Sequence, residues 1–408
     1  MVPEIRFKGG YGYWKKKKLI DEVNLYSGLT YSPNDVCDKG TLVLRSSNVQ
    51  EGELSFLDNV YVKPQIINSS NVEEGDIIVV VRNGSRALIG KHAVIKHPLK
   101  NTVIGAFMAG LRPKNTQDSN FMNALLSSKK FDDEVTKNLG ATINQITNGT
   151  FCSIEFLFPD NKERSYIGTY FKSLDNLIQL TTKKITSLKQ LKSASLISMF
   201  PQTGETKPRI RFKGFEGDWE KKNLNMCLSI STEKNISDNY GIEAVLSVSD
   251  DFGVMNQIEL LGRSYAGKSV RNYGILKKGE IVYTKSPLKS KPFGIIKQNT
   301  YRTGIVSVLY AVYTAKDGIS ADYIHYYFDP AWRLNAYMRP LVNKGAKNTM
   351  NISNETALDS FIMIPQNIAE QQQIASFFRS LDTQISLETQ RLEKLKQIKS
   401  ACLDKMFV

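Results

Sequence analysis

One stretch of the sequence carries residues that could bind a nucleotide. Residues 262–269 read GRSYAGKS and match the phosphate-binding pattern G-x-x-x-x-G-K-[ST]. Such a loop holds phosphates only where it joins a buried strand to a helix whose first amides face the anion. Here the preceding NQIELL is a poor buried strand, and the following VRNYGILKKGE has two glycines and no helical stripe. We therefore interpret the stretch as a basic loop that contacts a polyanion through Arg263, Lys268 and Arg271.

Residues suited to other kinds of catalysis are few and dispersed. The three histidines (His92, His97 and His325) lie in strand-like or aromatic helical contexts, which favours structural roles. The carboxylates form no cluster resembling a metal site, and the Asn/Asp-Pro-Pro-aromatic element of amino-methyltransferases does not occur. The four cysteines include no C-x-x-C pair, so they indicate neither a disulfide framework nor a zinc site. We expect no catalytic residue, metal or cofactor in this chain.

The charge of the chain indicates its partner. The 408 residues carry a net charge of +14 with a pI near 9.3, a surplus that favours a polyanion such as nucleic acid. The apolar content of 41% is that of an ordinary globular protein. The sequence contains no apolar run of membrane-spanning length, and the N-terminus lacks the apolar core of a signal peptide. We expect a cytoplasmic protein.

Polar residues that could contact DNA follow predicted strands in both halves of the chain. They come after the strands TLVL, IIVVV and IVY, and beside two Gly-Ala turns. Arg pairs with guanine and Asn or Gln with adenine, whereas Lys and Ser commonly bind phosphate. Besides the basic residues of the 262–271 region, we expect the following to bind DNA: Arg45, Ser47, Asn48, Arg82, Asn83, Arg86, Asn144, Gln145, Asn148, Lys285, Ser286, Lys289, Lys291, Lys344, Lys347 and Asn348.

The elements that position these loops are predicted to be mixed α and β. Val, Ile, Tyr and Phe alternate with Gly, Asn and Pro, which is typical of strands and turns. Two segments, VEEGDII (72–78) and LKKGEIV (276–282), share a turn that runs into a strand. Residues 139–159 and 344–365 likewise share a Gly-Ala step that leads to a strand ending in proline. We also expect internal helices at Asp118–Asn138 and Ser320–Tyr337.

Two long stretches are copies of each other. Residues 171–200 and 378–407 share 16 identities in 30 positions, contain no Gly or Pro, and have apolar residues at helical spacing. Their seams, interrupted at matching places, predict two long helices that pair with each other as a coiled coil. The residues expected at the pairing seam are Phe171, Leu174, Ile178, Ile185, Leu188, Phe378, Leu381, Ile385, Leu392 and Leu395.

The beginnings of the two halves repeat as well. Residues 3–9 (PEIRFKG) match residues 208–214 (PRIRFKG), and each is followed by a tryptophan and lysines. The polar segment 201–208 (PQTGETKP) cannot continue a helix and is predicted to be a linker. We expect globular domains at 1–160 and 209–365, and long helices at 161–200 and 366–408.

These repeats resemble the specificity subunits of type I restriction-modification systems along the whole chain. The EQQ-x-IA segment at 370–375 is also typical of that family, although residues 163–168 keep only its Glu and Ile. The resemblance implies an α+β fold in which two long antiparallel helices separate two target-recognition domains. It implies a non-catalytic subunit that reads a bipartite double-stranded DNA target within a DNA adenine methyltransferase or restriction complex. Two methyltransferase subunits, docked on the helices, and two motor-nuclease subunits would hold S-adenosylmethionine, ATP and Mg²⁺.

Two alternatives remain at this point. One is an ATP-dependent enzyme built on Gly262–Ser269, which would lose ATP binding in a Lys268→Ala variant. The other is a coiled-coil structural adaptor, which would not bind DNA even at low salt. A helix from Phe171 to Met199 would be about 43 Å long, at 1.5 Å per residue. Since one turn of B-DNA is about 34 Å, such helices could set the distance between two half-sites.

Overall fold

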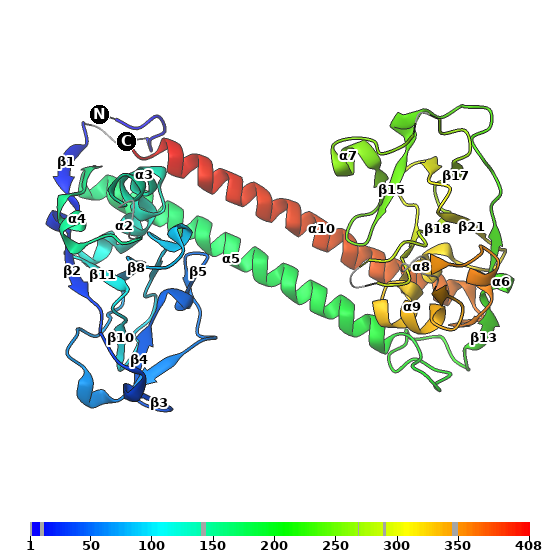
Figure 1. Ribbon diagram of the computed structural model, residues 1–408, viewed down its shortest axis with the longest axis horizontal. Helices are drawn as coiled ribbons and strands as arrows, with labels where there is room; N and C mark the ends of the chain where they lie inside the picture. Colours follow the sequence, from blue (N-terminus) through cyan, green and yellow to red (C-terminus); the bar gives the residue numbers. More distant parts are fainter. Residues whose placement is uncertain (1, 9–11, 140–143, 268, 289–290, 345–349) are drawn as a thin grey trace. The chain divides into compact units, whose positions relative to one another are not determined.

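The computed structural model describes residues 2–8, 12–139, 144–267, 269–288, 291–344 and 350–408. The chain forms two compact units: unit 1 consists of Met1–Lys183 and Thr389–Val408, and unit 2 of Lys184–Glu388. Two 38-residue helices, α5 (Asn161–Ser198) and α10 (Ile368–Lys405), each contribute to both units (Figure 1). Each unit is described by itself below.

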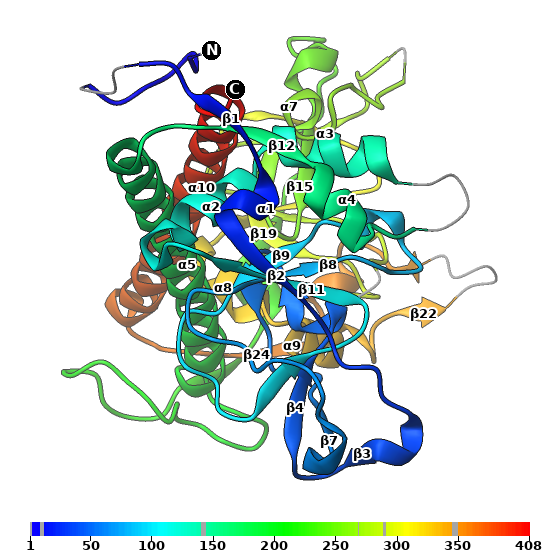
Figure 2. The same cartoon turned by 90° about the vertical axis from the view of Figure 1, so that its left-hand side faces the viewer.

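Unit 1 is built around an antiparallel sheet with the strand order β2-β11-β8-β9. A second sheet has the order β10-β4-β7-β3, in which β10 is parallel to β4. The second sheet extends away from α3 and α4 (Figures 1 and 2). The strands of unit 1 are β1 (Lys15–Lys18), β2 (Val23–Ser27), β3 (Val36–Cys37), β4 (Thr41–Leu44), β5 (Val49–Gln50), β6 (Glu53–Leu54), β7 (Val60–Val62), β8 (Ile77–Val80), β9 (His92–Val94), β10 (Thr102–Ile104), β11 (Met108–Pro113) and β12 (Glu155–Phe158).

Unit 2 repeats the central sheet of unit 1, with the equivalent order β14-β21-β18-β19. Its peripheral strands differ, because β15–β16, β17–β20 and β22–β23 form separate two-stranded sheets. The strands of unit 2 are β13 (Glu220–Asn223), β14 (Leu228–Ile230), β15 (Leu246–Ser249), β16 (Gly253–Asn256), β17 (Gly274–Leu276), β18 (Ile281–Tyr283), β19 (Ile296–Gln298), β20 (Gly304–Val306), β21 (Ala311–Ala315), β22 (Asn343–Lys344), β23 (Met350–Asn351) and β24 (Phe361–Ile364).

The shared turn predicted before the central strand is present in both units. Gly75 and Gly279 have φ angles of +92° and +94°, which favour glycine because a Cβ would crowd the backbone there. The carboxylates that follow close each turn: Asp76 accepts a hydrogen bond from the Glu73 amide, and Glu280 accepts one from the Lys277 amide. Strands β8 and β18 then begin at the next residue, and both are fully buried.

The predicted internal helices are each divided into two, which corrects the sequence-based boundaries. In unit 1 the break falls at Ser128, whose extended backbone precedes α3. In unit 2 it falls at Pro330, which has no N–H to donate to a continuing helix. The helices besides α5 and α10 are α1 (Leu19–Glu22), α2 (Ser119–Leu126), α3 (Lys129–Asn138), α4 (Asn148–Ser153), α6 (Leu224–Cys227), α7 (Gln257–Leu261), α8 (Ala321–Phe328) and α9 (Ala331–Met338).

The repeated opening segment of unit 1 is tied to the start of α5. The Arg6 guanidinium donates two hydrogen bonds to the Glu163 carboxylate, at 2.6 and 2.7 Å. The indole Nε1 of Trp14 donates a third, at 3.2 Å. Glu163 is buried and has lost its hydrating water, and these donors take the place of that water around its charge. The contact lies close in sequence to the β1–β12 pair, since Trp14 precedes β1 and Glu163 follows β12. Together, the contact and the strand pair hold the first turn of α5 in place.

Unit 2 contains the same contact at the start of α10. Arg211 donates two hydrogen bonds to Glu370, at 2.7 and 2.8 Å, and Trp219 donates one at 3.3 Å. Glu163 and Glu370 occupy the same position of the repeat, and Glu163 is one of the two residues that segment 163–168 shares with the EQQ-x-IA segment. The Arg, Trp and Glu of the repeat therefore form one buried structural contact in each half.

Within each unit, the two long helices lie against each other. In unit 1, Lys399 of α10 pairs with Asp175 of α5 at 2.6 Å. In unit 2, Lys192 of α5 pairs with Asp382 of α10 at 2.8 Å. These are the same two positions of the repeat, with donor and acceptor exchanged between the helices, as antiparallel pairing of two copies requires.

The apolar residues predicted at the helix seam are all buried or half-buried. The ring of Phe171 lies 6.1 Å from that of Phe407 in unit 1, and the ring of Phe378 lies 5.9 Å from that of Phe200 in unit 2. The Met-Phe pair that follows each helix, Met199-Phe200 or Met406-Phe407, is thereby buried in the core of a globular domain. In the described part of the chain, no helix is long and apolar enough to cross a membrane.

Candidate nucleic-acid interface

In unit 1 the three predicted DNA-binding loops meet at one place. They follow β4 (residues 45–48), follow β8 (residues 82–86) and precede β12 (residues 144–148). The Asn83 side-chain amide donates to Ser46 Oγ at 3.1 Å, and its backbone amide donates to the Asn144 carbonyl at 3.3 Å. Asn144 in turn donates to the Gly84 carbonyl at 3.1 Å. Arg82 and Gln145 form an isolated antiparallel bridge.

Phe107 also belongs to this cluster, and sequence reasoning missed it. It lies in the turn between β10 and β11 and is 51% exposed. The guanidinium carbon of Arg82 lies 5.1 Å from the centre of its ring. The sequence gives only a weak indication of this residue, because a single aromatic residue follows Gly105-Ala106 between two apolar strands.

The arginines of the cluster differ in how their charge is used. Arg45 pairs with Asp58 at 2.7 Å. Arg82 and Arg86 are exposed, and no carboxylate among the described residues lies within ion-pair distance of either. Their charges are therefore available to an anion from solution. The Oγ of Ser47 is buried with no hydrogen-bond partner among the described residues.

Of the two predicted asparagine contacts Asn48 and Asn148, the first serves the fold of unit 1. Asn48 is fully buried: its Oδ1 accepts from the Arg45 amide at 2.9 Å, and its Nδ2 donates to the Ser55 carbonyl at 2.9 Å. A side chain so occupied cannot reach a base, so we leave Asn48 out of the proposed contacts. Asn148 is exposed at the start of α4 and donates to Ser27 Oγ at 3.0 Å.

In unit 2, Lys285 and Ser286 follow β18, as Val81 and Arg82 follow β8 in unit 1. The ammonium of Lys285 donates to Asn354 Oδ1. Burial lowers the pKa of Lys285 from its ordinary value. The residue has a φ of +50°, in the left-handed region that non-glycine residues seldom adopt. Ser286 is half-buried beside it.

Lys291 is a structural residue, contrary to the sequence-based expectation. It is buried, and its ammonium lies 2.6 Å from Asp250 and 2.8 Å from the Asp329 carbonyl. A buried lysine held in this way cannot also bind phosphate. Lys344 lies in β22. The predicted contacts that fall outside the described residues are Lys268, Lys289, Lys347 and Asn348.

The stretch Gly262–Ser269 lacks the context that a nucleotide-binding loop needs. It follows the short helix α7, and Gly262 ends that helix in a left-handed conformation with a φ of +76°. A phosphate-binding loop instead follows a buried strand and opens a helix. Arg263 lies over the ring of Tyr265 at 4.6 Å, and Arg271 donates to the Ile236 carbonyl at 2.9 Å. Both arginines are exposed.

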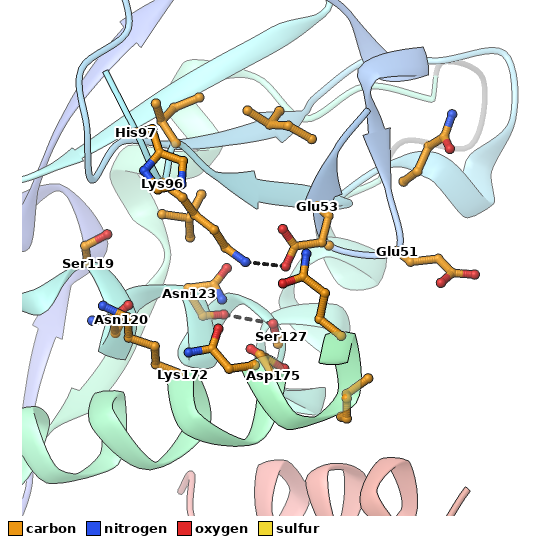
Figure 3. A pocket seen from close by; sticks show the side chains of 18 of the residues that line it. Glu51, Glu53, Lys96, His97, Ser119, Asn120, Asn123, Ser127, Lys172 and Asp175 are labelled. Atoms are coloured by element: carbon orange, nitrogen blue, oxygen red, sulfur yellow. Dashed lines mark hydrogen bonds and ion pairs between the residues drawn. The ribbon is translucent and has the colours of Figure 1, made fainter. Parts of the chain in front are cut away.

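A large groove in unit 1 lies elsewhere and has a nearly balanced charge. It has a volume of about 1230 Å³ and runs between α5 and the strands β6 and β9. Lys172 and Asp175 point into it from α5, opposite the ion pair between Lys96 and Glu53 (Figure 3). Its lining includes five lysines and four carboxylates, so it lacks the positive surplus that a DNA-binding groove requires. None of the described residues predicted to bind DNA lines it.

Two of the histidines lie in structural positions. Across the described residues, no group of three or more His, Cys, Asp or Glu side chains could hold a metal ion. His92 is half-buried between the Gly90 carbonyl and Ser127 Oγ, and desolvation lowers its pKa. His325 is half-buried in α8, where desolvation and the charge of Lys297 lower its pKa to about 3. A histidine so placed stays neutral at physiological pH.

The sequence of the chain matches a known family model. The model of the type I restriction modification DNA specificity domain matches two stretches, residues 11–190 and 264–397, which together make up more than half of the chain. The chain belongs to the family of type I restriction-modification specificity subunits. These subunits are not catalytic, in agreement with the sequence-based expectation. The P-loop enzyme and the structural adaptor are not supported.

Two curated relatives and one solved structure show how much of this specificity subunit is similar to known proteins in sequence and in fold. The StySPI specificity subunit of Salmonella potsdam is 24% identical over 44% of this chain and 40% of its own length. The EcoKI specificity subunit of Escherichia coli is 22% identical over 94% of this chain and 87% of its own. The crystal structure of an S subunit from M. genitalium superposes with a TM-score of 0.66 at 13% identity, covering 100% of this chain and 99% of that one. This last likeness confirms the mixed α/β fold.

Proposed function

We propose that each unit of this specificity subunit reads one half of a bipartite, asymmetric double-stranded DNA target. The observation that carries the proposal is a repeated frame with unlike loops. The central sheet, the Arg-Trp-Glu contact and the Lys-Asp helix pair occur in both units, whereas the loops after the central strands differ in sequence. A duplicated scaffold with unlike loops suits two different half-sites.

The contacts we propose in unit 1 are the residues whose polar atoms face the shared loop junction. Arg82 and Arg86 supply charge, while Asn83, Asn144 and Gln145 supply amides that could read adenine. Arg45, Ser47 and Asn148 lie at the edge of the same junction. In unit 2 we propose Arg263, Arg271, Lys285 and Ser286. Five further residues are proposed from the sequence alone: Lys268, Lys289, Lys344, Lys347 and Asn348.

We propose that α5 and α10 set the distance between the half-sites. A continuous helix of 38 residues is about 57 Å long at 1.5 Å per residue. That exceeds one turn of B-DNA, about 34 Å, so a helix of this length can connect domains that read half-sites about one turn apart.

Exposed apolar residues on the helices support a docking surface for methyltransferase subunits. Leu180 is 61% exposed, and Leu387, which occupies the same position of the repeat, is 59% exposed. Leu191 and Ile398 form a second equivalent and exposed pair. Because each helix presents the same apolar positions, two copies of one partner could bind equivalently. We propose two methyltransferase subunits, with two motor-nuclease subunits completing the restriction complex. S-adenosylmethionine, ATP and Mg²⁺ would be held by those partners.

Methylome sequencing of the host, with and without this gene, tests the proposal. We expect loss of adenine methylation at one bipartite motif when the gene is deleted, and its return on complementation. Methylation that does not change on deletion, or a lost motif that is continuous, would contradict it. The purified complex should also lose affinity steeply with salt, because phosphate contacts release counterions. The chromosomal target places this activity in the cytoplasm.

A further inference from the structure

The turn between β10 and β11 holds its exposed aromatic side chain at a fixed place. The Phe107 carbonyl accepts hydrogen bonds from the amides of Val81 and Arg82, at 2.9 and 3.2 Å. The amide of Gly105 donates to the Leu44 carbonyl at 2.8 Å. These bonds attach the turn to the ends of β8 and β4, the two strands that carry the predicted contact loops. The backbone under Phe107 is therefore ordered before any ligand arrives.

The equivalent turn of unit 2 also exposes large apolar side chains. It connects β20 to β21, and Val308 and Leu309 are 61% and 65% exposed. The turn is closed by the Tyr310 amide, which donates to the Ser307 carbonyl at 2.9 Å. An apolar side chain at this turn is thus common to both units, although the residue types differ.

The surroundings of Phe107 favour DNA as what it contacts. Arg82 lies over its ring, and Arg86 lies on the same loop without an ion pair among the described residues. The loops joined at this place also carry the side-chain amides of Asn83 and Asn144 and the hydroxyl of Ser46. This environment is cationic and polar, as an interface for a polyanion should be. The apolar group that the major groove of DNA presents is the C5-methyl of thymine.

We propose that the β10–β11 turn is a specificity-determining element in which Phe107 contacts a thymine methyl group of one half-site. Val308 and Leu309 do the same for the other half-site. This inference rests on the proposed function, since it assumes that each unit reads one half-site. The inference adds an apolar base contact to the polar contacts of the loops. The turn that makes this contact is equivalent in the two units, but its residue types differ.

Deoxyuridine provides the test, because it differs from thymidine only by the missing methyl group. Once the target is known, the complex with its methyltransferase subunits is titrated with duplexes that carry deoxyuridine at one position at a time. We expect one position in one half-site to weaken binding about four-fold, the effect of losing one buried methyl-sized group. In the Phe107→Ala variant, binding to the thymine duplex should weaken by a similar factor, and deoxyuridine at that position should have no further effect.

Matched variants separate this contact from general effects. Phe361→Ala removes a phenylalanine of similar exposure (53%) that also lies under a cation, Lys221 at 5.0 Å, but belongs to the β13–β24 sheet. It should leave affinity and deoxyuridine sensitivity unchanged. Phe107→Leu should keep part of the sensitivity. A double Val308→Ser, Leu309→Ser variant should remove sensitivity only in the other half-site.

Several outcomes would overturn the inference. If the Phe107→Ala substitution reduced the affinity for thymine and deoxyuridine duplexes equally, the Phe107 side chain would be inserted between base pairs and would not contact the methyl group. Less methyltransferase subunit co-purifying with Phe107→Ala would indicate a protein contact. Deoxyuridine without effect at every position would exclude methyl readout. If the wild-type complex did not prefer its target to a scrambled duplex, the proposed function itself would fail, which is a different result.

Discussion

At the scale of single residues, burial separates the predicted DNA contacts into two groups. Asn48 and Lys291 are buried and hydrogen-bonded to backbone groups or, for Lys291, also to a carboxylate, so they hold the loops in shape. Arg82 and Arg86 are exposed in the same kind of loop, and neither has a carboxylate near it among the described residues. A polar loop needs residues of both kinds, because buried backbone groups must be hydrogen-bonded before side chains can be presented.

Replacing Arg82 by Ala is expected to weaken binding of the complex to its target. If the guanidinium pairs with a guanine, the loss should be roughly 1–3 kcal/mol, with relaxed preference at one base pair of one half-site. Fluorescence anisotropy with single-substitution duplexes measures both effects. Arg209→Ala, which removes an exposed arginine paired with Glu205, is the control and should bind as the wild type does. An Arg82→Ala variant with unchanged affinity and preference would rule out this role.

His325 is expected to make the protein less stable in acid. Its folded-state pKa is lowered to about 3 by burial and by Lys297, with Lys192 adding to the effect and Asp329 opposing it. The unfolded chain binds a proton below about pH 6.5, whereas the native state does not until about pH 3. The free energy of unfolding should therefore fall as pH decreases from about 6.5 to 3, by at most about 1.4 kcal/mol per pH unit from this group.

Urea unfolding at a series of pH values measures that slope. The His325→Gln variant should show a shallower decline over this range, because the group that takes up the proton on unfolding is gone. His97→Gln removes an exposed histidine of unit 1 and should leave the slope unchanged. An equally steep decline in His325→Gln would show that other groups dominate.

At the scale of elements, the repeat encodes both the start and the pairing of each long helix. Glu163 and Glu370 lie in the first turns of α5 and α10, and the arginine and tryptophan of the opening segment bind them. The Lys-Asp pairs then align the helices in an antiparallel register. Partly buried pairs of this kind set register more than they add stability, because desolvation offsets much of their attraction.

Charging the exposed leucines of the helices should reduce partner binding in steps. Leu180→Glu and Leu387→Glu each place a charge in one of the two proposed docking surfaces, so each single variant should bind one methyltransferase subunit instead of two. The double variant should bind none. Analytical ultracentrifugation of the purified mixture gives the stoichiometry. Ser386→Glu, one residue from Leu387 and also exposed, is the control. Two subunits bound to the double variant would refute this docking surface.

At the scale of the whole molecule, the proposed target depends on helix length and on the two sets of loops independently. Inserting one heptad in either helix lengthens that helix by about 10.5 Å, which corresponds to about three base pairs of B-DNA. We expect the spacer of the methylated motif to change while both half-site sequences stay the same. Inserting the matching heptad in both helices is the stricter form of this experiment, because it preserves the apolar register in which the helices pair. A changed half-site with an unchanged spacer, read by methylome sequencing, would contradict the model.

The sequence by itself determined the repeat, the long helices and the family. Periodicity and identity at a constant offset are local properties, so they can be read without coordinates, as Phe171 and Phe378 show. The positions of the polar loops after strands were also predicted, because polar residues after an apolar strand mark the end of that strand; that these loops contact DNA stays a prediction. The function of Arg6 and Trp14 could not be read, since Glu163, which they bind, lies about 150 residues away in sequence.

Only the tertiary structure decided which residues of the loops remain available to a ligand. Asn48 and Arg82 look equally suited to base recognition in the sequence, yet one is fully buried and the other is exposed. Phe107 became a candidate only because its turn is bonded to the ends of β4 and β8. The physical reason is that burial and convergence depend on contacts between segments far apart in the chain, which residue type and spacing do not encode.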